Sequence, residues 1–183
     1  MTQLLTVGHG RLDRAGLGAL LRQAGVEALV DVRRYPGSRN NPDVARDALS
    51  EWLPQWGVDY RWEPRLGGRR RLTKDEDARS PDAWWTVAAF RAYAAYTRTA
   101  EFRVGLDQLV AQAAGQRVAV MCSESVWWRC HRRLIADVAA LGRGLHVLDL
   151  MHDGRQLPHR VADGARVRDD GQLVWSGSTE GGR

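Results

Sequence analysis

The interpretation of this chain starts from residues 118–142, VAVMCSESVWWRCHRRLIADVAALG. The first four residues are apolar and predict a short buried strand that stops at Cys122. After a polar turn and two tryptophans, apolar residues recur at helical spacing, and Gly142 is a typical helix end. The segment therefore predicts a strand followed by a helix. A thiol and a carboxylate (Glu124) leave the strand, and the helix opens with Cys130, His131 and several arginines.

The rest of the chain alternates short apolar runs with amphipathic stretches. Apolar runs predict strands at residues 4–7, 28–32, 58–62 and 145–150. Helical spacing, with Asp13 and Thr99 as N-caps, predicts helices at residues 13–25, 44–52, 84–96 and 101–114. The alternation predicts one doubly wound α/β domain over residues 1–183, with a mainly parallel sheet flanked by helices. We expect residues 72–82 to be mobile and residues 160–183 to form a polar tail, in which residues 173–175 could add an edge strand.

Composition limits the class of protein. The chain has 183 residues and is 44% hydrophobic, enough to bury a core. No run approaches the roughly 20 apolar residues of a membrane span, and the first residues lack the features of a secretory signal. We therefore expect a soluble, cytoplasmic protein without a membrane partner. In a reducing compartment a disulfide between Cys122 and Cys130 is not expected, and Cys130 is expected to pack beside Leu134.

The formal net charge of +5 suggests an anionic partner, either a small molecule or nucleic acid. Lys74 is the one lysine, so the arginine content can also reflect genome composition rather than function. Clusters are more informative than the total, and three stand out: Arg33, Arg34 and Arg39; Arg65, Arg69, Arg70 and Arg71; and Arg129, Arg132 and Arg133.

Several short sequence motifs, in this order along the chain, resemble those of a bacterial family known as domain of unknown function 488. They are TVGHG at 6–10, DVRRYPGSR at 31–39, YRWEPRLGG at 60–68, FRAYAAYTRTAEF at 90–102, MCSESVWWRCHRRLIA at 121–136, and His159. The resemblance implies a compact α/β domain with a parallel sheet, and it gives a weak hint of DNA repair. Gly10 stands where the family usually has serine, so one hydroxyl is missing from the expected site.

If the sheet is parallel, the carboxyl ends of its strands meet at one edge, where such folds bind ligands. His9, Asp31, Arg33 and Cys122 then face one crevice, and the Gly67–Gly68 loop could close over it. Convergence of residues distant in sequence is stronger evidence for a site than any one motif.

Cys122 is the candidate nucleophile, because a thiolate near a helix N-terminus and arginines has a pKa below the ordinary value of ~8.5. Glu124, His9 and Asp31 complete the candidate catalytic set, with the histidines able to act as acid or base near neutral pH. The candidate residues for holding the anion or substrate are Arg33, Arg39, Gly67, Gly68, Cys130, His131 and Arg132. The alternative is a small buried thiol within a structural ion-pair network.

Known cysteine motifs fit poorly. A phosphatase loop needs arginine six positions after the cysteine, where this chain has Trp128. A sulfur-transfer loop of the rhodanese type is disfavoured by the bulk of Trp127 and Trp128. A zinc set made of Cys122, Cys130, His131 and His9 lacks a standard ligand spacing, so we expect no metal and no cofactor.

Three hypotheses follow from the sequence. The first is an enzyme that acts on a phosphorylated or nucleobase-containing substrate through Cys122. The second is a nucleic-acid-binding protein whose cysteines are structural, and which holds a strand with Arg69–Arg71 and tryptophans. The third is a small-molecule binder without turnover.

Overall fold

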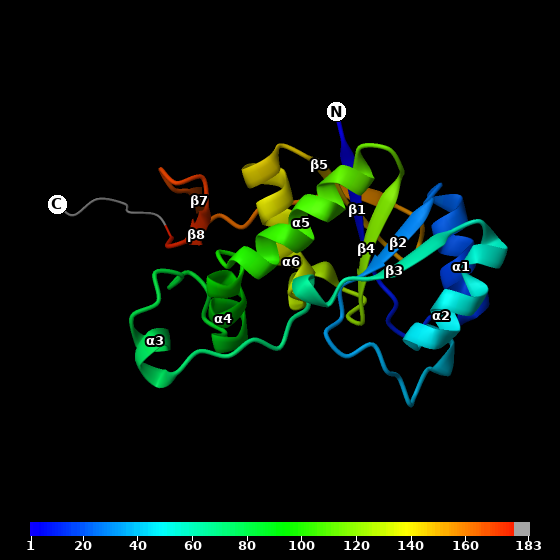
Figure 1. Ribbon diagram of the computed structural model, residues 1–183, viewed down its shortest axis with the longest axis horizontal. Coiled ribbons are helices and arrows are strands. Elements are labelled where there is room, and N and C mark those ends of the chain that lie inside the picture. Colours follow the sequence, from blue (N-terminus) through cyan, green and yellow to red (C-terminus); the bar gives the residue numbers. More distant parts are fainter. Residues whose placement is uncertain (178–183) are drawn as a thin grey trace.

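A twisted sheet forms the centre of the computed structural model, which describes residues 1–177 (Figure 1). In this part of the chain it has six strands, in the order β3-β2-β4-β1-β5-β6. Their bounds are Gln3–Gly8 (β1), Ala28–Asp31 (β2), Asp59–Trp62 (β3), Val118–Cys122 (β4), His146–Leu150 (β5) and Gln156–Pro158 (β6). Strands β1 to β5 are parallel and β6 is antiparallel to β5. The predicted α/β class with a mainly parallel sheet is confirmed.

Helices cover both faces of the sheet. Helices α1 (Arg14–Gln23) and α2 (Arg46–Trp52) pack on the face that presents Leu5 and Val7. Helices α5 (Ala100–Ala113) and α6 (Arg132–Asp137) pack on the opposite face, and α6 continues into a π-helical turn, η5 (Val138–Gly142). Because both faces are buried, the central strands need apolar residues at nearly every position, and β4 has them. Within residues 1–177, no helix combines the length and the apolar character needed to cross a membrane.

Local chemistry explains where the helices begin. The Asp13 side chain accepts a hydrogen bond from the backbone N–H of Gly16 at 2.8 Å, and Thr99 accepts one from Phe102 at 3.2 Å, so both predicted N-caps are confirmed. Helix α4 (Ala88–Tyr96) is shorter than predicted. The carbonyl oxygens of Trp85 and Thr86 accept from Arg91 Nη1 at 2.8 and 3.0 Å, and the backbone N–H of Trp84 donates to Trp175 O. The stretch expected to be mobile contains a short helix, α3 (Lys74–Ala78), which begins with a Thr73 capping box.

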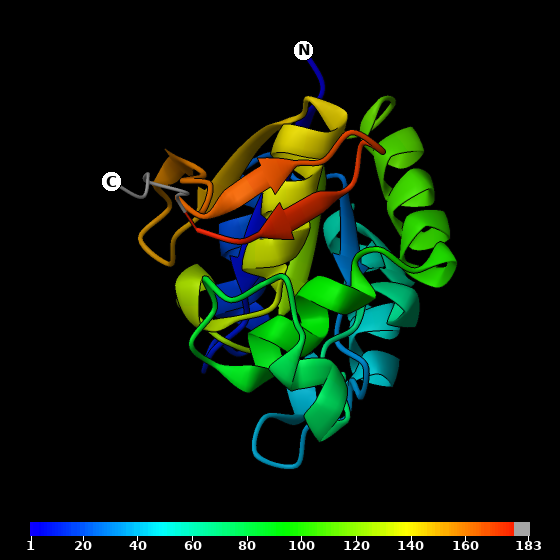
Figure 2. The same ribbon diagram turned by 90° about the vertical axis from the view of Figure 1, so that its left-hand side faces the viewer.

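The C-terminal part forms a second, two-stranded sheet from β7 (Ala165–Val167) and β8 (Leu173–Trp175). Figure 2 shows these strands lying across the helix made by α6 and η5. Residues 173–175 are therefore a strand, as expected, but not an edge of the main sheet. Trp175 fixes this position, since it is fully buried and its Nε1 donates to Asp137 Oδ2 on α6 at 2.8 Å. Residues 178–183 of the predicted tail lie outside the described residues.

A buried charge cluster ties the C-terminal part to the sheet. His159 Nε2 lies 2.9 Å from Asp137 Oδ1 and Nδ1 lies 2.9 Å from Asp149 Oδ2. Asp149 also accepts from the Thr6 hydroxyl of β1 at 2.5 Å. Burial by itself would lower the pKa of His159, but the hydrogen bonds to the two carboxylates outweigh it and raise the pKa to about 9. His159 is therefore an imidazolium at neutral pH, and both ring nitrogens donate.

This cluster predicts a stability that falls at alkaline pH. Because the pKa of folded His159 is raised from 6.5 to about 9, its contribution is complete below pH 6.5 and is lost as pH rises through 9. We expect the free energy of unfolding, measured by urea denaturation, to lose roughly 3 kcal/mol over this range. His159→Gln should remove most of this pH dependence, whereas His146→Gln, at the start of β5, should keep it. Equal pH profiles for wild type and His159→Gln would contradict the assignment.

Candidate active site

The order of the strands brings the predicted site residues together. Strand β4 lies between β1 and β2, with Cys122 opposite Gly8 and Met121 opposite Asp31. Cys122 is therefore flanked by the segments that carry His9 and Arg33. At this edge a cavity of about 440 Å³ is lined by seven of the predicted residues: His9, Arg33, Gly68, Cys122, Glu124, Cys130 and His131.

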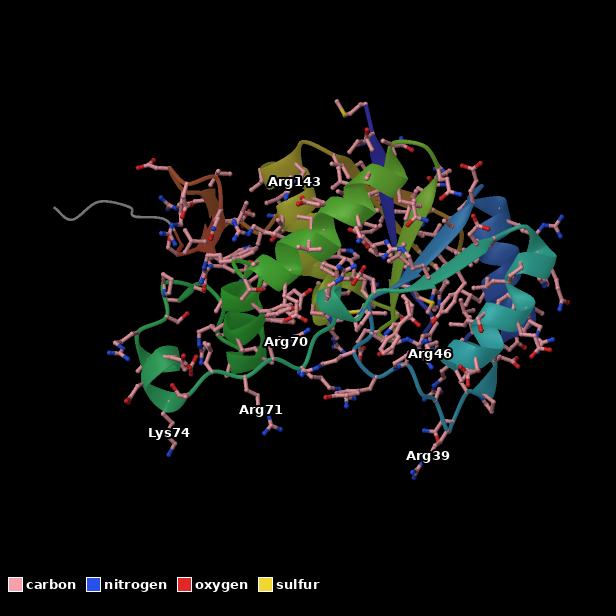
Figure 3. All side chains as sticks on the ribbon, viewed as in Figure 1. Arg39, Arg46, Arg70, Arg71, Lys74 and Arg143 are labelled. Atoms are coloured by element: carbon pink, nitrogen blue, oxygen red, sulfur yellow. A yellow bond between two sulfur atoms is a disulfide. The ribbon has the colours of Figure 1, made fainter. Side chains whose placement is uncertain are left out.

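The other four predicted residues do not line the cavity. Arg132 lies behind Cys122, and Asp31 lies behind Arg33. Gly67 packs against the backbone of Arg34, where a Cβ would come within 2.8 Å of the Arg34 Cα. Arg39 is exposed on the loop after β2 and points away from the protein (Figure 3). The structure gives Arg39 no contact with the cavity because this loop extends outward.

The two cysteines form a disulfide, with their Cα atoms 7.4 Å apart. The expectation of two separate thiols is therefore wrong for this structure. Between them, a short 3₁₀ turn, η4 (Trp127–Arg129), folds the chain back and places Cys130 opposite the end of β4. Nothing in the spacing of the two cysteines signals this fold-back. Both residues are buried, with Cys130 5% exposed and Cys122 1% exposed.

Arg132 contacts the disulfide from the protein side. Its Nη1 lies 2.6 Å from Cys122 Sγ and also donates to the carbonyl oxygen of Glu124. The side chain is 1% exposed, and within residues 1–177 it forms no ion pair with a carboxylate and leaves Nε without a partner. Burial lowers the pKa of Arg132 to about 10, although the charges of Asp149 and Glu124 partly oppose this. Burying a guanidinium without a counter-ion costs several kcal/mol of folding free energy. This position therefore favours an anion beside Arg132.

The turn around Arg132 depends on a glycine. A Cβ at Gly8 would collide with the Glu124 carbonyl and lie 2.9 Å from Arg132 Nη1. The Glu124 carbonyl that accepts from Arg132 can reach this position only because Gly8 has no side chain. Gly8 thus shapes the wall of the site.

Arg33 lines the cavity and is held in place by Asp31. Its Nε and Nη2 donate to the two carboxylate oxygens of Asp31 at 2.8 and 2.6 Å, and Nη2 also donates to Val44 O. Tyr60 donates its hydroxyl to Asp31 at 2.7 Å, and burial, together with the Asp31 charge, raises the pKa of Tyr60. With its oxygens occupied in this way, Asp31 is a positioning residue for Arg33.

The two histidines of the cavity are neutral at neutral pH. His9 Nδ1–H donates to Gly10 O at 2.9 Å, which leaves Nε2 to accept from Arg33 Nη1 at 3.3 Å. Burial lowers the pKa of His9. His131 Nε2–H donates to Val32 O at 3.0 Å, and its Nδ1 lies 3.5 Å from Cys130 Sγ. Burial lowers the pKa of His131 to about 4.

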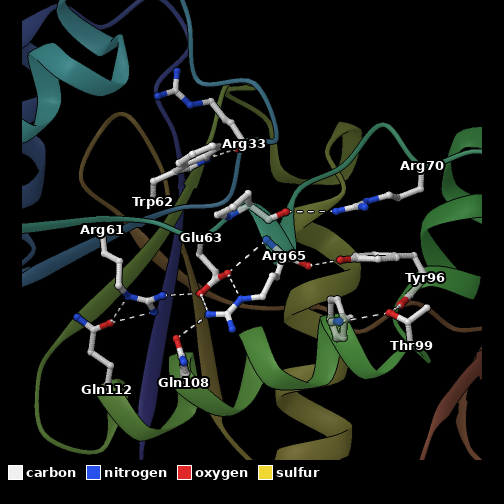
Figure 4. Close-up of polar contacts among 12 residues, drawn as sticks. Arg33, Arg61, Trp62, Glu63, Arg65, Arg70, Tyr96, Thr99, Gln108 and Gln112 are labelled. Atoms are coloured by element: carbon white, nitrogen blue, oxygen red, sulfur yellow. Dashed lines mark hydrogen bonds and ion pairs between the residues drawn. The ribbon is translucent and has the colours of Figure 1, made fainter.

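Glu63 anchors the start of the glycine loop through hydrogen bonds from two arginines (Figure 4). It accepts from Arg61 Nη1 at 2.6 Å and from Arg65 Nε at 2.7 Å, just before the 3₁₀ turn η3 (Pro64–Leu66). Burial would raise the pKa of Glu63, but the hydrogen bonds from Arg65 and Arg61 outweigh it and lower the pKa. The loop ends at Gly68, where a Cβ would lie 2.9 Å from His131 Nδ1. Only a glycine lets the loop approach the imidazole this closely.

Sequence reasoning missed two parts of the cavity wall. Helix α4 contributes Phe90 and Tyr93, which no motif marks as site residues. Three exposed or half-buried arginines, Arg34, Arg69 and Arg129, also line the cavity. The sequence showed them only as members of arginine clusters, whereas the residues chosen as anion ligands, Arg33 and Arg132, are committed to internal contacts.

Possible metal ligands are not grouped in this part of the molecule. Among the described residues, no three side chains of His, Cys, Asp or Glu are arranged to hold a metal ion. Cys122 and Cys130 instead contact each other, and His9 contacts Arg33.

The fold and the cavity define an α/β protein with a disulfide and a buried arginine at the carboxyl edge of its sheet. Residues 13–139 match the family described as domain of unknown function DUF488, and the chain belongs to this family. The matched region contains Arg33, Cys122 and Arg132, while His9 and His159 lie outside it. Comparison with curated proteins and with solved structures gave no match.

Proposed function

We propose that this protein is an enzyme in which Cys122, once reduced, acts as a thiolate nucleophile on a small phosphorylated or nucleobase-containing anion. The observation that supports this most directly is the 2.6 Å contact between Arg132 Nη1 and Cys122 Sγ. A thiolate at this position supplies the anion that the buried guanidinium otherwise lacks, and the guanidinium in turn favours the thiolate over the thiol.

The other residues of the cavity fit an anionic substrate. Arg34, Arg69 and Arg129 line its open side and supply positive charge without being held by a buried carboxylate. Tyr35 is 60% exposed, with the guanidinium carbons of Arg34 and Arg69 5.5 and 5.6 Å from its ring centre. An exposed ring between cations offers a stacking surface for a base, while the cations bind phosphate. Glu124, which lines the cavity and is exposed, is the candidate for proton transfer.

The proposal predicts how Cys122 reacts with iodoacetamide. In Cys130→Ser, Cys122 is the sole thiol, and its rate of alkylation should rise with pH through a midpoint below the ordinary ~8.5. Adding Arg132→Gln should raise that midpoint and slow alkylation at pH 7 by about tenfold. Arg132→Lys should retain much of the effect. Inorganic phosphate, as a probe of the cavity, should slow the alkylation.

Arg133→Gln is the matched control for this experiment. The Arg133 guanidinium lies 4.9 Å from the ring centre of Trp85 and, within residues 1–177, forms no hydrogen bond with either cysteine, so its loss should leave the midpoint unchanged. An ordinary midpoint that does not respond to Arg132, with no protection by phosphate, would refute a nucleophilic role for Cys122.

A second candidate function is binding of single-stranded nucleic acid. A groove of about 780 Å³ adjoins the cavity through Arg34, Tyr35 and Arg69, and continues past Arg71 and Lys74. Figure 3 shows Arg71 and Lys74 pointing away from the protein. The tryptophans add little to this hypothesis. Trp85 is buried against Phe90 and Trp175, and of the tryptophans within residues 1–177 only Trp128, at 45%, is exposed.

Salt dependence tests this second function. If the groove binds a strand, the affinity for a labelled single-stranded oligonucleotide should fall steeply with salt, with a slope of about −0.7 for each phosphate contacted. Replacing both Arg69 and Arg71 with alanine should make the salt slope shallower by the amount expected for the loss of about one to two phosphate contacts. Arg39→Ala, on the outward loop, is the control and should change neither slope nor affinity. No measurable binding at low salt would reject this function.

A further inference from the structure

We infer that Cys122 and Cys130 are a reversible redox couple that exchanges with a small, negatively charged thiol entering the cavity. This activity is distinct from the proposed nucleophilic catalysis, although reduction of the disulfide is what would release the Cys122 thiolate. Four features of the site support it: both cysteines line the cavity, they differ in exposure, they have different polar partners, and the entrance is cationic.

The two sulfurs are not equivalent as targets of an incoming thiolate. Cys130 is the more exposed residue, at 5% against 1% for Cys122. Arg132 Nη1 contacts Cys122 Sγ at 2.6 Å, so negative charge that develops on this sulfur is stabilised. Exchange is faster when the leaving thiolate is stabilised and when the attacked sulfur is accessible. The geometry therefore points to attack on Cys130, with Cys122 as the leaving group.

His131 is placed to receive the second thiol. Because its Nε2–H donates to Val32 O at 3.0 Å, the lone pair of neutral His131 is on Nδ1, 3.5 Å from Cys130 Sγ. This nitrogen accepts a hydrogen bond from the S–H of reduced Cys130 but has no proton to offer a thiolate. The donor to this sulfur is the neutral backbone N–H of Arg132, at 3.5 Å, rather than a guanidinium. Reduction thus yields a Cys122 thiolate beside Arg132 and a Cys130 thiol beside His131.

The reaction balances with two equivalents of thiol. The first RS⁻ attacks Cys130 Sγ, forms an RS–Cys130 bond and breaks the Cys122–Cys130 bond, whose electron pair stays on Cys122. The second RS⁻ attacks the sulfur of the bound RS group, which forms RSSR and releases Cys130. Of the two protons given up by the thiols, one goes to Cys130 and one to solvent. The protein disulfide is reduced and the thiol is oxidised to its disulfide.

Charge at the entrance indicates the class of thiol. Arg34, Arg69 and Arg129 surround the opening, with Glu124 as the acidic residue among the lining side chains. A thiol that carries carboxylates is attracted to this entrance, whereas a cationic thiol is repelled. Glutathione is a suitable probe of the first kind and cysteamine of the second.

The test follows where glutathione becomes attached. Full-length single-cysteine variants are incubated with oxidised glutathione, and the adduct is followed by intact mass. At pH 7, Cys130→Ser, whose Cys122 is a thiolate beside Arg132, should attack oxidised glutathione and accumulate the adduct faster than Cys122→Ser, whose Cys130 is a thiol beside His131. Equal rates, or faster attachment to Cys130, would overturn the assignment of Cys122 as the stabilised leaving thiolate.

A measurement on the wild-type protein covers the case in which a variant fails to fold. The oxidised protein is treated with glutathione under native conditions, alkylated at intervals and mapped by peptide mass. We expect two thiols to appear, a transient glutathione adduct on Cys130, and slower reduction by cysteamine at low salt. If the disulfide resists both thiols until the protein is denatured, it is structural and the inference is wrong.

The outcome is separable from that of the proposed function. Reduction by a phosphine exposes both thiols without thiol exchange, so alkylation of Cys122 can be measured whether or not glutathione reacts. A low alkylation midpoint without glutathione exchange would reject the redox couple and leave the nucleophile. Glutathione exchange together with an ordinary alkylation midpoint for Cys122 would support the redox couple and reject the activated nucleophile.

Discussion

A buried guanidinium without a carboxylate partner is the constraint on which the site depends. Arg132 is 1% exposed, its Nη1 contacts the sulfur of Cys122, and the other hydrogen bonds of its guanidinium within the described residues go to backbone carbonyls. Carbonyl dipoles offset part of the cost of burying a charge but do not neutralise it. A thiolate at Cys122 would neutralise this charge. The same contact therefore accounts for a reactive thiol and for a disulfide in which Cys122 is the better leaving group.

The sheet makes this contact possible by its strand order rather than by any local motif. Strand β4 lies between β1 and β2, so the end of β4 meets His9 on one side and the Asp31–Arg33 pair on the other. Two buried acids hold the surroundings in place: Asp31 orients Arg33, and Glu63 anchors the loop that brings Gly68 against His131. On the far side of the site, His159 links α6, β5 and the η4 tryptophan Trp127, whose ring centre lies 5.0 Å from the imidazole.

Much of this was predictable from residue patterns. Apolar runs predicted β1 to β5, caps at Asp13 and Thr99 were correct, and parallel strands implied that His9, Arg33 and Cys122 converge. The features that could not be predicted from the sequence depend on tertiary contacts. The disulfide needs the η4 turn to fold back, and in the stretch before α4 the Arg91 side chain occupies the carbonyl oxygens of Trp85 and Thr86. The bond between Arg33 and Asp31, two residues away, was not predictable because it depends on side-chain geometry. His159 had no interpretable spacing because its partners, Asp137 and Asp149, lie on other elements.

The most direct test of this account is the charge state of reduced Cys122. In the wild-type protein, labelled with carbon-13 and reduced by a phosphine, the chemical shift of the Cys122 Cβ reports thiol or thiolate as pH is varied. The account predicts that Cys122 is mainly a thiolate at pH 7, with Arg132 as its counter-ion. A Cβ shift that remains that of a thiol at pH 7 and titrates near the ordinary ~8.5 would contradict it.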